Sequence, residues 1–134
     1  MLRDKTLTYV SLFSSAGVGC FGFKQEGYHC IATNELIDRR MEVQRANHKC
    51  ELDSGYVVGD ITLPEVRNSI IQEIAKWRSR GNDRVDVLIA TPPCQGISVI
   101  NHKKRNPTLA VIALWLNLFQ WLKKSNRVSS FLKT

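Results

Sequence analysis

Short apolar runs alternate with helix-like segments along the first 90 residues, and this alternation limits the folds open to the chain. Runs rich in β-branched and aromatic residues predict strands over residues 7–13, 28–33, 56–61 and 85–90. The spacing of apolar residues between these runs predicts helices over residues 20–26, 36–47 and 64–81, the last capped by Thr62. Parallel strands need long crossover connections, which are usually helices. We therefore expect an α/β fold with a doubly wound parallel sheet.

Length and composition fit one domain with a hydrophobic core. The chain has 134 residues, of which 43% are hydrophobic, and such a composition is unlike that of a disordered chain. The longest apolar stretch, residues 109–121, is shorter than the ~18–20 residues that a membrane span needs. The N-terminus has no apolar run typical of a secretory signal. We expect a cytoplasmic protein with no membrane partner.

The four cysteines show no spacing typical of a zinc site, so we expect no metal. Reduced thiols are the expected state in the cytosol. Cys20, Cys30 and Cys50 are expected to be small buried residues.

Cys94 stands apart because it follows Pro92 and Pro93 directly after the strand predicted over residues 85–90. Two prolines fix the backbone and remove two N–H donors, so the loop cannot extend the strand. They direct the Cys94 side chain towards the edge of the sheet. An accessible thiolate is a strong nucleophile. We interpret Cys94 as a catalytic nucleophile, and the alternative is a fourth buried thiol.

Doubly wound sheets bind ligands beyond the carboxyl ends of their strands. Four segments should therefore line one crevice: residues 14–19, 34–36, 60–61 and 91–98. In the first segment Gly17 begins a G-x-G-x-x-G match, whose small residues let a ligand approach the backbone. Glu35 can accept hydrogen bonds from both hydroxyls of a ribose, and Asp60 from an adenine amino group. These residues favour an adenosine-containing cofactor, either NAD or S-adenosylmethionine.

The whole formal charge of +7 lies in residues 101–134, which contain seven basic residues and no acid. A helix over residues 107–124 and a short strand over residues 128–132 are expected there. A basic segment is typical of proteins that bind a polyanion such as nucleic acid. A solvated, flexible tail is the alternative.

Four motifs, in order along the chain, resemble those of the DNA (cytosine-5) methyltransferases. Leu12-Phe13-Ser14-Ser15-Ala16-Gly17-Val18-Gly19 is similar to the first motif, Asn34-Glu35 to the second and Gly59-Asp60-Ile61-Thr62 to the third. Pro92-Pro93-Cys94-Gln95-Gly96-Ile97-Ser98 resembles the highly specific nucleophile motif. Ser11, Ser15 and Val18 depart from residues that are common in the family, but the loop stays small. The resemblance implies a Rossmann-like S-adenosylmethionine-dependent methyltransferase fold, with part of the doubly wound sheet.

The resemblance also implies roles for individual residues. Cys94 would add to carbon 6 of a cytosine that is rotated out of double-stranded DNA. The residues expected to contact S-adenosylmethionine are Phe13, Ser14, Gly17, Val18, Glu35, Leu36, Asp60, Ile61 and Pro93. Those expected to contact the base or the DNA are Gln95, Ser98, Lys103, Lys104 and Arg105.

The resemblance covers only the N-terminal part of the family's catalytic domain. The next family signature, Glu-Asn-Val, does not follow residue 98, and we expect the target-recognition domain to be missing as well. We therefore expect residues 1–100 to form the cofactor and nucleophile part, and residues 101–134 to form a basic segment of an incomplete domain. Activity would then require a second chain with the missing motifs. Two alternatives stay open, namely an NAD(P)-binding oxidoreductase and a non-catalytic nucleic-acid-binding remnant.

Overall fold

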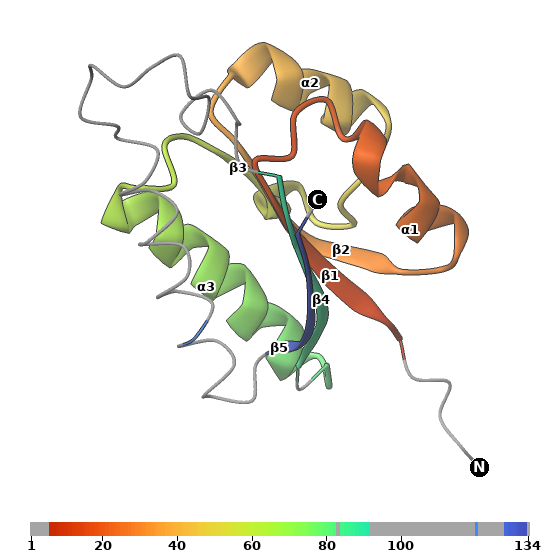
Figure 1. Cartoon of the computed structure of the whole chain (residues 1–134). Coiled ribbons are helices and arrows are strands. Elements are labelled where there is room, and N and C mark those ends of the chain that lie inside the picture. The colour runs from red at the N-terminus through yellow and green to blue at the C-terminus, as the bar shows by residue number, and fades with distance from the viewer. Residues whose placement is uncertain (1–5, 83, 92–119, 121–127, 134) are drawn as a thin grey trace.

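The computed structural model describes residues 6–82, 84–91, 120 and 128–133. The strands among these residues form a five-stranded, fully parallel sheet (Figure 1). The strand order is β3-β2-β1-β4-β5. The strands are β1 (Thr8–Leu12), β2 (His29–Glu35), β3 (Tyr56–Val58), β4 (Val85–Ala90) and β5 (Val128–Lys133). Since β1 pairs with both β2 and β4, the order reverses at β1. This confirms the predicted α/β fold with a doubly wound parallel sheet.

Helices cover both faces of the sheet (Figure 1). The helical elements are η1 (Val18–Cys20), α1 (Phe21–Gln25), α2 (Asp38–Ala46), η2 (Asp53–Gly55) and α3 (Pro64–Ser79). The two short helices α1 and α2 lie on one face, and the longer α3 lies on the other. No helix in the described part of the chain is long and apolar enough to cross a membrane.

The face covered by α3 holds the larger apolar core. Val66, Ile70, Ile74 and Trp77 recur at helical spacing and are all buried. They pack in one cluster with strand residues that include Val10, Leu12, Ile31, Val57 and Leu88. The helix begins with Pro64, while Leu63 occupies the N-cap without a side-chain hydrogen bond. The prediction that Thr62 caps this helix was wrong, because its hydroxyl instead donates to Oδ1 of Asp60.

The opposite face has a smaller core of aromatic and sulfur-containing residues. Tyr9 packs against Phe23, with ring centroids 5.4 Å apart. Cys20, Cys30 and Cys50 are all buried in this cluster, as predicted. Residues on alternate positions of one strand face opposite sides of a sheet. Tyr9 and Val10 therefore belong to different clusters.

Three predicted strands differ from the observed ones at their ends. The first stops at Leu12, because Phe13 adopts the left-handed region with φ of 53°. The third stops at Val58, because Gly59 follows with φ of 139°. The second continues to Glu35 and pairs with β3 through its last three residues. The predicted C-terminal strand is confirmed, since β5 pairs with β4. The helix predicted over residues 107–124 lies outside the described residues except for Gln120, which is helical.

Candidate cofactor and nucleophile site

The loop after β1 turns sharply at the carboxyl edge of the sheet. Phe13, Ser15 and Gly17 have φ angles of 53°, 54° and 84°. Residues other than glycine rarely adopt this region, and they persist there only where their surroundings fix them. The backbone of Ser14 donates to the carbonyl of Asn34 at 3.0 Å, and its hydroxyl donates to the same oxygen at 2.9 Å. The loop is thus attached to the end of β2, and Ser14 is buried rather than free to contact a ligand.

Glu35 is buried at the end of β2, with 6% of its surface exposed. Its Oε2 accepts a hydrogen bond from the backbone N–H of Ser15 at 2.7 Å, and its Oε1 from that of Ile37 at 3.1 Å. Arg40 Nη1 lies 3.7 Å from Oε1. A carboxylate has about four acceptor positions. The observed bonds therefore fix the carboxylate and still leave it capacity for the hydroxyls of a ribose.

The end of β3 is tied to the end of β2. Asn34 Nδ2 donates to the carbonyls of Val57 and Gly59 at 3.0 and 3.1 Å. The N–H of Gly59 donates to the carbonyl of Glu35 at 3.0 Å. The exposed carboxylate of Asp60 accepts the N–H and hydroxyl of Thr62 at 2.9 and 2.8 Å.

Two predicted cofactor residues beside these strand ends differ in exposure. Leu36 follows β2 and is 65% exposed, so its side chain is open to a ligand. Ile61 follows Asp60 and is 7% exposed, packed in the core on the α3 face. The side chain of Ile61 therefore packs in the core, and only its backbone is left for the predicted contact with the cofactor.

Thr91 connects the end of β4 to the loop after β1. Its N–H donates to the carbonyl of Leu12 at 3.3 Å, and its hydroxyl donates to the carbonyl of Phe13 at 2.8 Å. Thr91 directly precedes the predicted nucleophile segment. The segment that carries Cys94 therefore directly follows a residue that is hydrogen-bonded to the predicted cofactor loop, which comprises residues 13–19 after β1. Other predicted residues lie outside the described part of the chain, namely Pro93, Cys94, Gln95, Ser98, Lys103, Lys104 and Arg105.

The three cysteines in the described part of the chain are poorly placed for nucleophilic chemistry. Cys30 and Cys50 are buried with their Sγ atoms 3.4 Å apart. The hydrogen bond with Cys30, together with burial, raises the pKa of the Cys50 thiol. Cys20 is buried against the hydroxyl of Ser11, 3.2 Å from its Oγ. No cluster of metal-ligating side chains occurs among the described residues.

The sequence matches the family described as C-5 cytosine-specific DNA methylase over residues 7–125. The chain belongs to this family. The matched range starts just before β1 and includes both the cofactor loop and the predicted nucleophile segment.

Similarity to individual methyltransferases agrees with this assignment. The chain is 39% identical over 98 residues to Type II methyltransferase M1.HgaI of Avibacterium volantium, covering 71% of the chain and 24% of the relative. It is 33% identical over 94 residues to Type II methyltransferase M1.HphI of Haemophilus parahaemolyticus, covering 70% and 23%. It is 28% identical over 101 residues to the DNA-cytosine methyltransferase of Escherichia coli K12, covering 73% and 21%. The similar region thus amounts to about a quarter of the length of these relatives.

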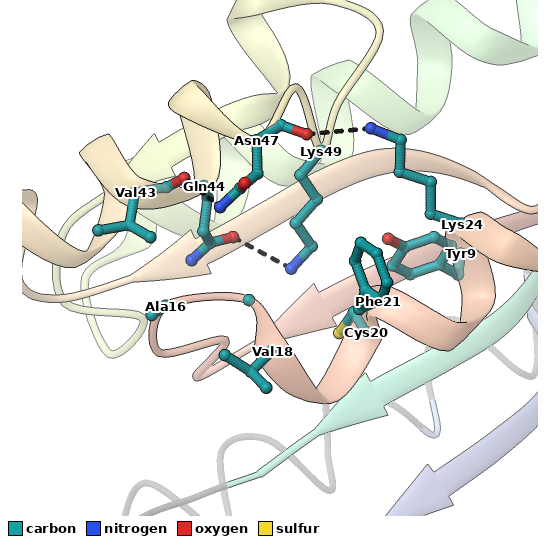
Figure 2. A pocket seen from close by; sticks show the side chains of 11 residues that line it. Tyr9, Ala16, Val18, Cys20, Phe21, Lys24, Val43, Gln44, Asn47 and Lys49 are labelled. Atoms are coloured by element: carbon teal, nitrogen blue, oxygen red, sulfur yellow. Dashed lines mark hydrogen bonds between the residues drawn. The ribbon is translucent and has the colours of Figure 1, made fainter.

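A pocket of about 260 Å³ lies beside the predicted cofactor loop, between the segment with Ala16 and Val18 and helix α2 (Figure 2). Its lining includes Gly17 and Val18 but neither Glu35 nor Asp60. The pocket therefore shares the loop with the predicted site but lies on the face of α1 and α2. The predicted cofactor acceptors Glu35 and Asp60 lie instead at the ends of β2 and β3.

Sequence reasoning missed one polar residue that reaches the cofactor loop. Gln44 is 1% exposed, and its amide nitrogen donates to the carbonyl of Ser15 at 2.5 Å. The available signal was its spacing of three residues from Met41, which places both on the buried face of α2. Glutamine is seldom buried, so the pattern alone pointed to an exposed residue.

Proposed function

We propose that this chain is the cofactor-binding and nucleophile-bearing part of a DNA (cytosine-5) methyltransferase. One observation carries the proposal: Thr91, directly before Pro92-Pro93-Cys94-Gln95, is hydrogen-bonded through its hydroxyl to Phe13 in the cofactor loop at 2.8 Å. The nucleophile and the methyl donor must reach adjacent atoms of one substrate ring, and this bond joins the two segments that would supply them. The family match supports the same chemistry.

The residues at the strand ends fit an adenosine-containing cofactor. The small residues of the loop and its left-handed turn leave the backbone open to close approach. Glu35 would accept the ribose hydroxyls, Asp60 with the backbone of Ile61 would contact adenine, and Leu36 and Phe13 would supply apolar contact. Ser14 would support the loop, while Gly17, Val18 and Pro93 would line the cofactor. S-adenosylmethionine supplies an electrophilic methyl group when bound.

Cys94 would act on the pyrimidine ring. Its thiolate would add to carbon 6 of the cytosine, and the electron pair would move to carbon 5, which then becomes nucleophilic. After methylation a base would remove the proton from carbon 5, and the thiolate would leave again. The base must be extruded from the duplex first, at a cost of a few kcal/mol. Gln95 and Ser98 would contact the extruded base, and Lys103, Lys104 and Arg105 the phosphates.

Catalysis would also require family motifs beyond the four found in residues 12–98. The two Type II methyltransferases are each about four times as long as the region that is similar to this chain. A missing general acid typically costs ~10²–10⁴ in rate. We therefore propose that a second chain carrying the remaining motifs and a recognition domain completes the enzyme. Its action on DNA would take place in the cytoplasm, in a restriction-modification setting like that suggested by the Type II relatives.

Calorimetric titration with S-adenosylhomocysteine and with NADH tests the cofactor class. We expect weak binding of S-adenosylhomocysteine and none of NADH. Preferential binding of NADH would instead establish an oxidoreductase.

Transfer of tritium from labelled S-adenosylmethionine to DNA tests the reaction. We expect no transfer by the chain alone, and transfer after addition of a chain with the missing motifs. The Cys94→Ser variant is the control and should stay inactive with the added chain. Transfer by the wild-type chain alone, lost in Cys94→Ser, would refute the need for a partner. Salt-dependent DNA binding without any cofactor binding would favour a non-catalytic remnant.

A further inference from the structure

Gln44 is a buried polar side chain that connects helix α2 to the cofactor loop. Its Nε2 donates to the carbonyl of Ser15 at 2.5 Å and to the hydroxyl of Ser14 at 2.8 Å. Its Cγ would lie 3.1 Å from a Cβ at Gly17. One side chain thus hydrogen-bonds to two of the four residues from 14 to 17 and occupies the space next to a third. Figure 2 shows it reaching from α2 toward Ala16.

Lys49 determines which way the Gln44 amide points. Its Nζ donates to Oε1 of Gln44 and to the hydroxyl of Thr33, both at 3.0 Å. The hydroxyl of Thr33 also lies 2.7 Å from Oε1 of Gln44. An ammonium group can only donate hydrogen bonds. The amide oxygen must therefore face Lys49, and the amide nitrogen must face the loop.

The loop has a conformation that needs such external support. Ser15 has a φ of 54°, which a residue with a side chain rarely adopts. Its N–H donates to Glu35 and its carbonyl accepts from Gln44, so both polar groups of its backbone are fixed from outside the loop. Of these two contacts, the one to Glu35 belongs to the predicted cofactor site, whereas the one to Gln44 comes from helix α2.

We propose that Gln44 and Lys49 are positioning residues of the cofactor site. Gln44 holds the loop of residues 14–17 in its binding shape, and Lys49 holds the Gln44 amide in the required orientation. This inference rests on the proposed function, because it assigns the loop to S-adenosylmethionine.

The Gln44→Glu variant separates positioning from general stability. The new carboxylate keeps the size of the side chain and still accepts from Lys49 and Thr33. It has no donor for the carbonyl of Ser15, so two acceptor oxygens then face each other. We expect a small change in thermal midpoint together with a loosened loop. Lys49→Met, which frees the amide to rotate, is the second variant and should loosen the same loop.

Two measurements are made on the full chain of each variant. Amide hydrogen exchange follows the N–H groups of Ser14, Ser15 and Gly17, which are all hydrogen-bonded in the wild type. We expect exchange about tenfold faster in both variants, the size that loss of one hydrogen bond gives. Titration with S-adenosylhomocysteine should show affinity about tenfold weaker. Gln72→Glu makes the same change at an exposed position of α3 and should alter neither measurement.

The outcomes distinguish this inference from the proposed function. Unchanged exchange of the loop amides in both variants would overturn the positioning role. Faster exchange with unchanged affinity would overturn it as well, because the loop shape would then be irrelevant to the cofactor. A wild-type chain that binds no S-adenosylhomocysteine would refute the proposed function, while the exchange data would still decide whether Gln44 holds the loop.

Discussion

The two faces of the sheet are built from different chemistry. The face under α3 is a continuous apolar core in which Ile70, Ile74 and Trp77 pack on the strands. The face under α1 and α2 contains buried thiols, a pocket of about 260 Å³ and the polar contacts of Gln44 and Lys49. Apolar contacts stabilise without direction, whereas hydrogen bonds fix geometry. The difference indicates that one face supplies most of the stability and the other sets the shape of the cofactor loop.

The largest expected effect is the loss of apolar contact under α3. Ile74→Ala should lower the free energy of unfolding by about 2–5 kcal/mol, because it leaves a cavity in the larger core. Urea denaturation measures this loss, and the affinity of the remaining folded molecules for S-adenosylhomocysteine should not change. Ile71→Ala, at a partly exposed position of the same helix, should cost less. Equal costs at the two positions would contradict the assignment of stability to the buried face.

Glu35→Ala should have the largest effect on the cofactor loop itself. It removes the acceptor for the N–H groups of Ser15 and Ile37 and the predicted partner of the ribose. A hydrogen bond to a charged group contributes about 1.5–3 kcal/mol. The affinity for S-adenosylhomocysteine should therefore fall roughly 10- to 100-fold in a calorimetric titration. Glu42→Ala, at an exposed position of α2, is the control, and a similar loss there would argue against a specific role of Glu35.

Gly17→Ala tests the contact between the loop and α2. Gly17 has a φ of 84°, and an added Cβ would lie 3.1 Å from Cγ of Gln44. A left-handed residue with a side chain costs about 1–2 kcal/mol. The variant should bind S-adenosylhomocysteine roughly 5- to 30-fold more weakly, given about 1.4 kcal/mol for each factor of ten.

Gly22→Ala is the matched control for this substitution. Gly22 lies in α1 with no atom within 4 Å of an added Cβ, and its φ is not positive. Alanine there should stabilise the chain by about 0.4–1 kcal/mol. If both substitutions changed the affinity alike, the contact between Gly17 and Gln44 would have no role in binding.

The smallest expected effect concerns the link between β4 and the loop. Thr91→Val removes the hydroxyl that donates to the carbonyl of Phe13. The free energy of unfolding should fall by about 0.5–1.5 kcal/mol, as for one ordinary hydrogen bond. Thr91→Ser keeps the hydroxyl and should behave like the wild type in the same urea titration. An unaffected Thr91→Val variant would remove the structural link between the two halves of the proposed site.

Most helices and strands could be predicted from local patterns. The continuous apolar run of β4 and the helical spacing of Val66, Ile70 and Ile74 depend only on neighbouring residues. The ends of strands were less predictable. A strand ends where the backbone leaves the extended region, as at Phe13 and Gly59, and both residue types also occur inside strands.

The position of the candidate site could be predicted from the sequence, but the hydrogen bonds that hold its loop in place could not. Glu35 and Asp60 could be assigned to one edge, because the carboxyl ends of parallel strands always meet there. The contact between Gln44 and Ser15 joins residues 29 positions apart, and that between Thr91 and Phe13 joins residues 78 apart. No local pattern encodes such pairs.

The sequence by itself determined the order of strands and helices along the chain, the edge of the sheet at which Glu35 and Asp60 lie, and the family to which the motifs are similar. These properties follow from hydrophobic periodicity and from short motifs, both of which are local. Only the tertiary structure decided how the cofactor loop is held, since a buried glutamine can reach a strained loop only after α2 has packed beside it. Long-range hydrogen bonds depend on distances of a few tenths of an ångström, which the packing of the whole sheet sets.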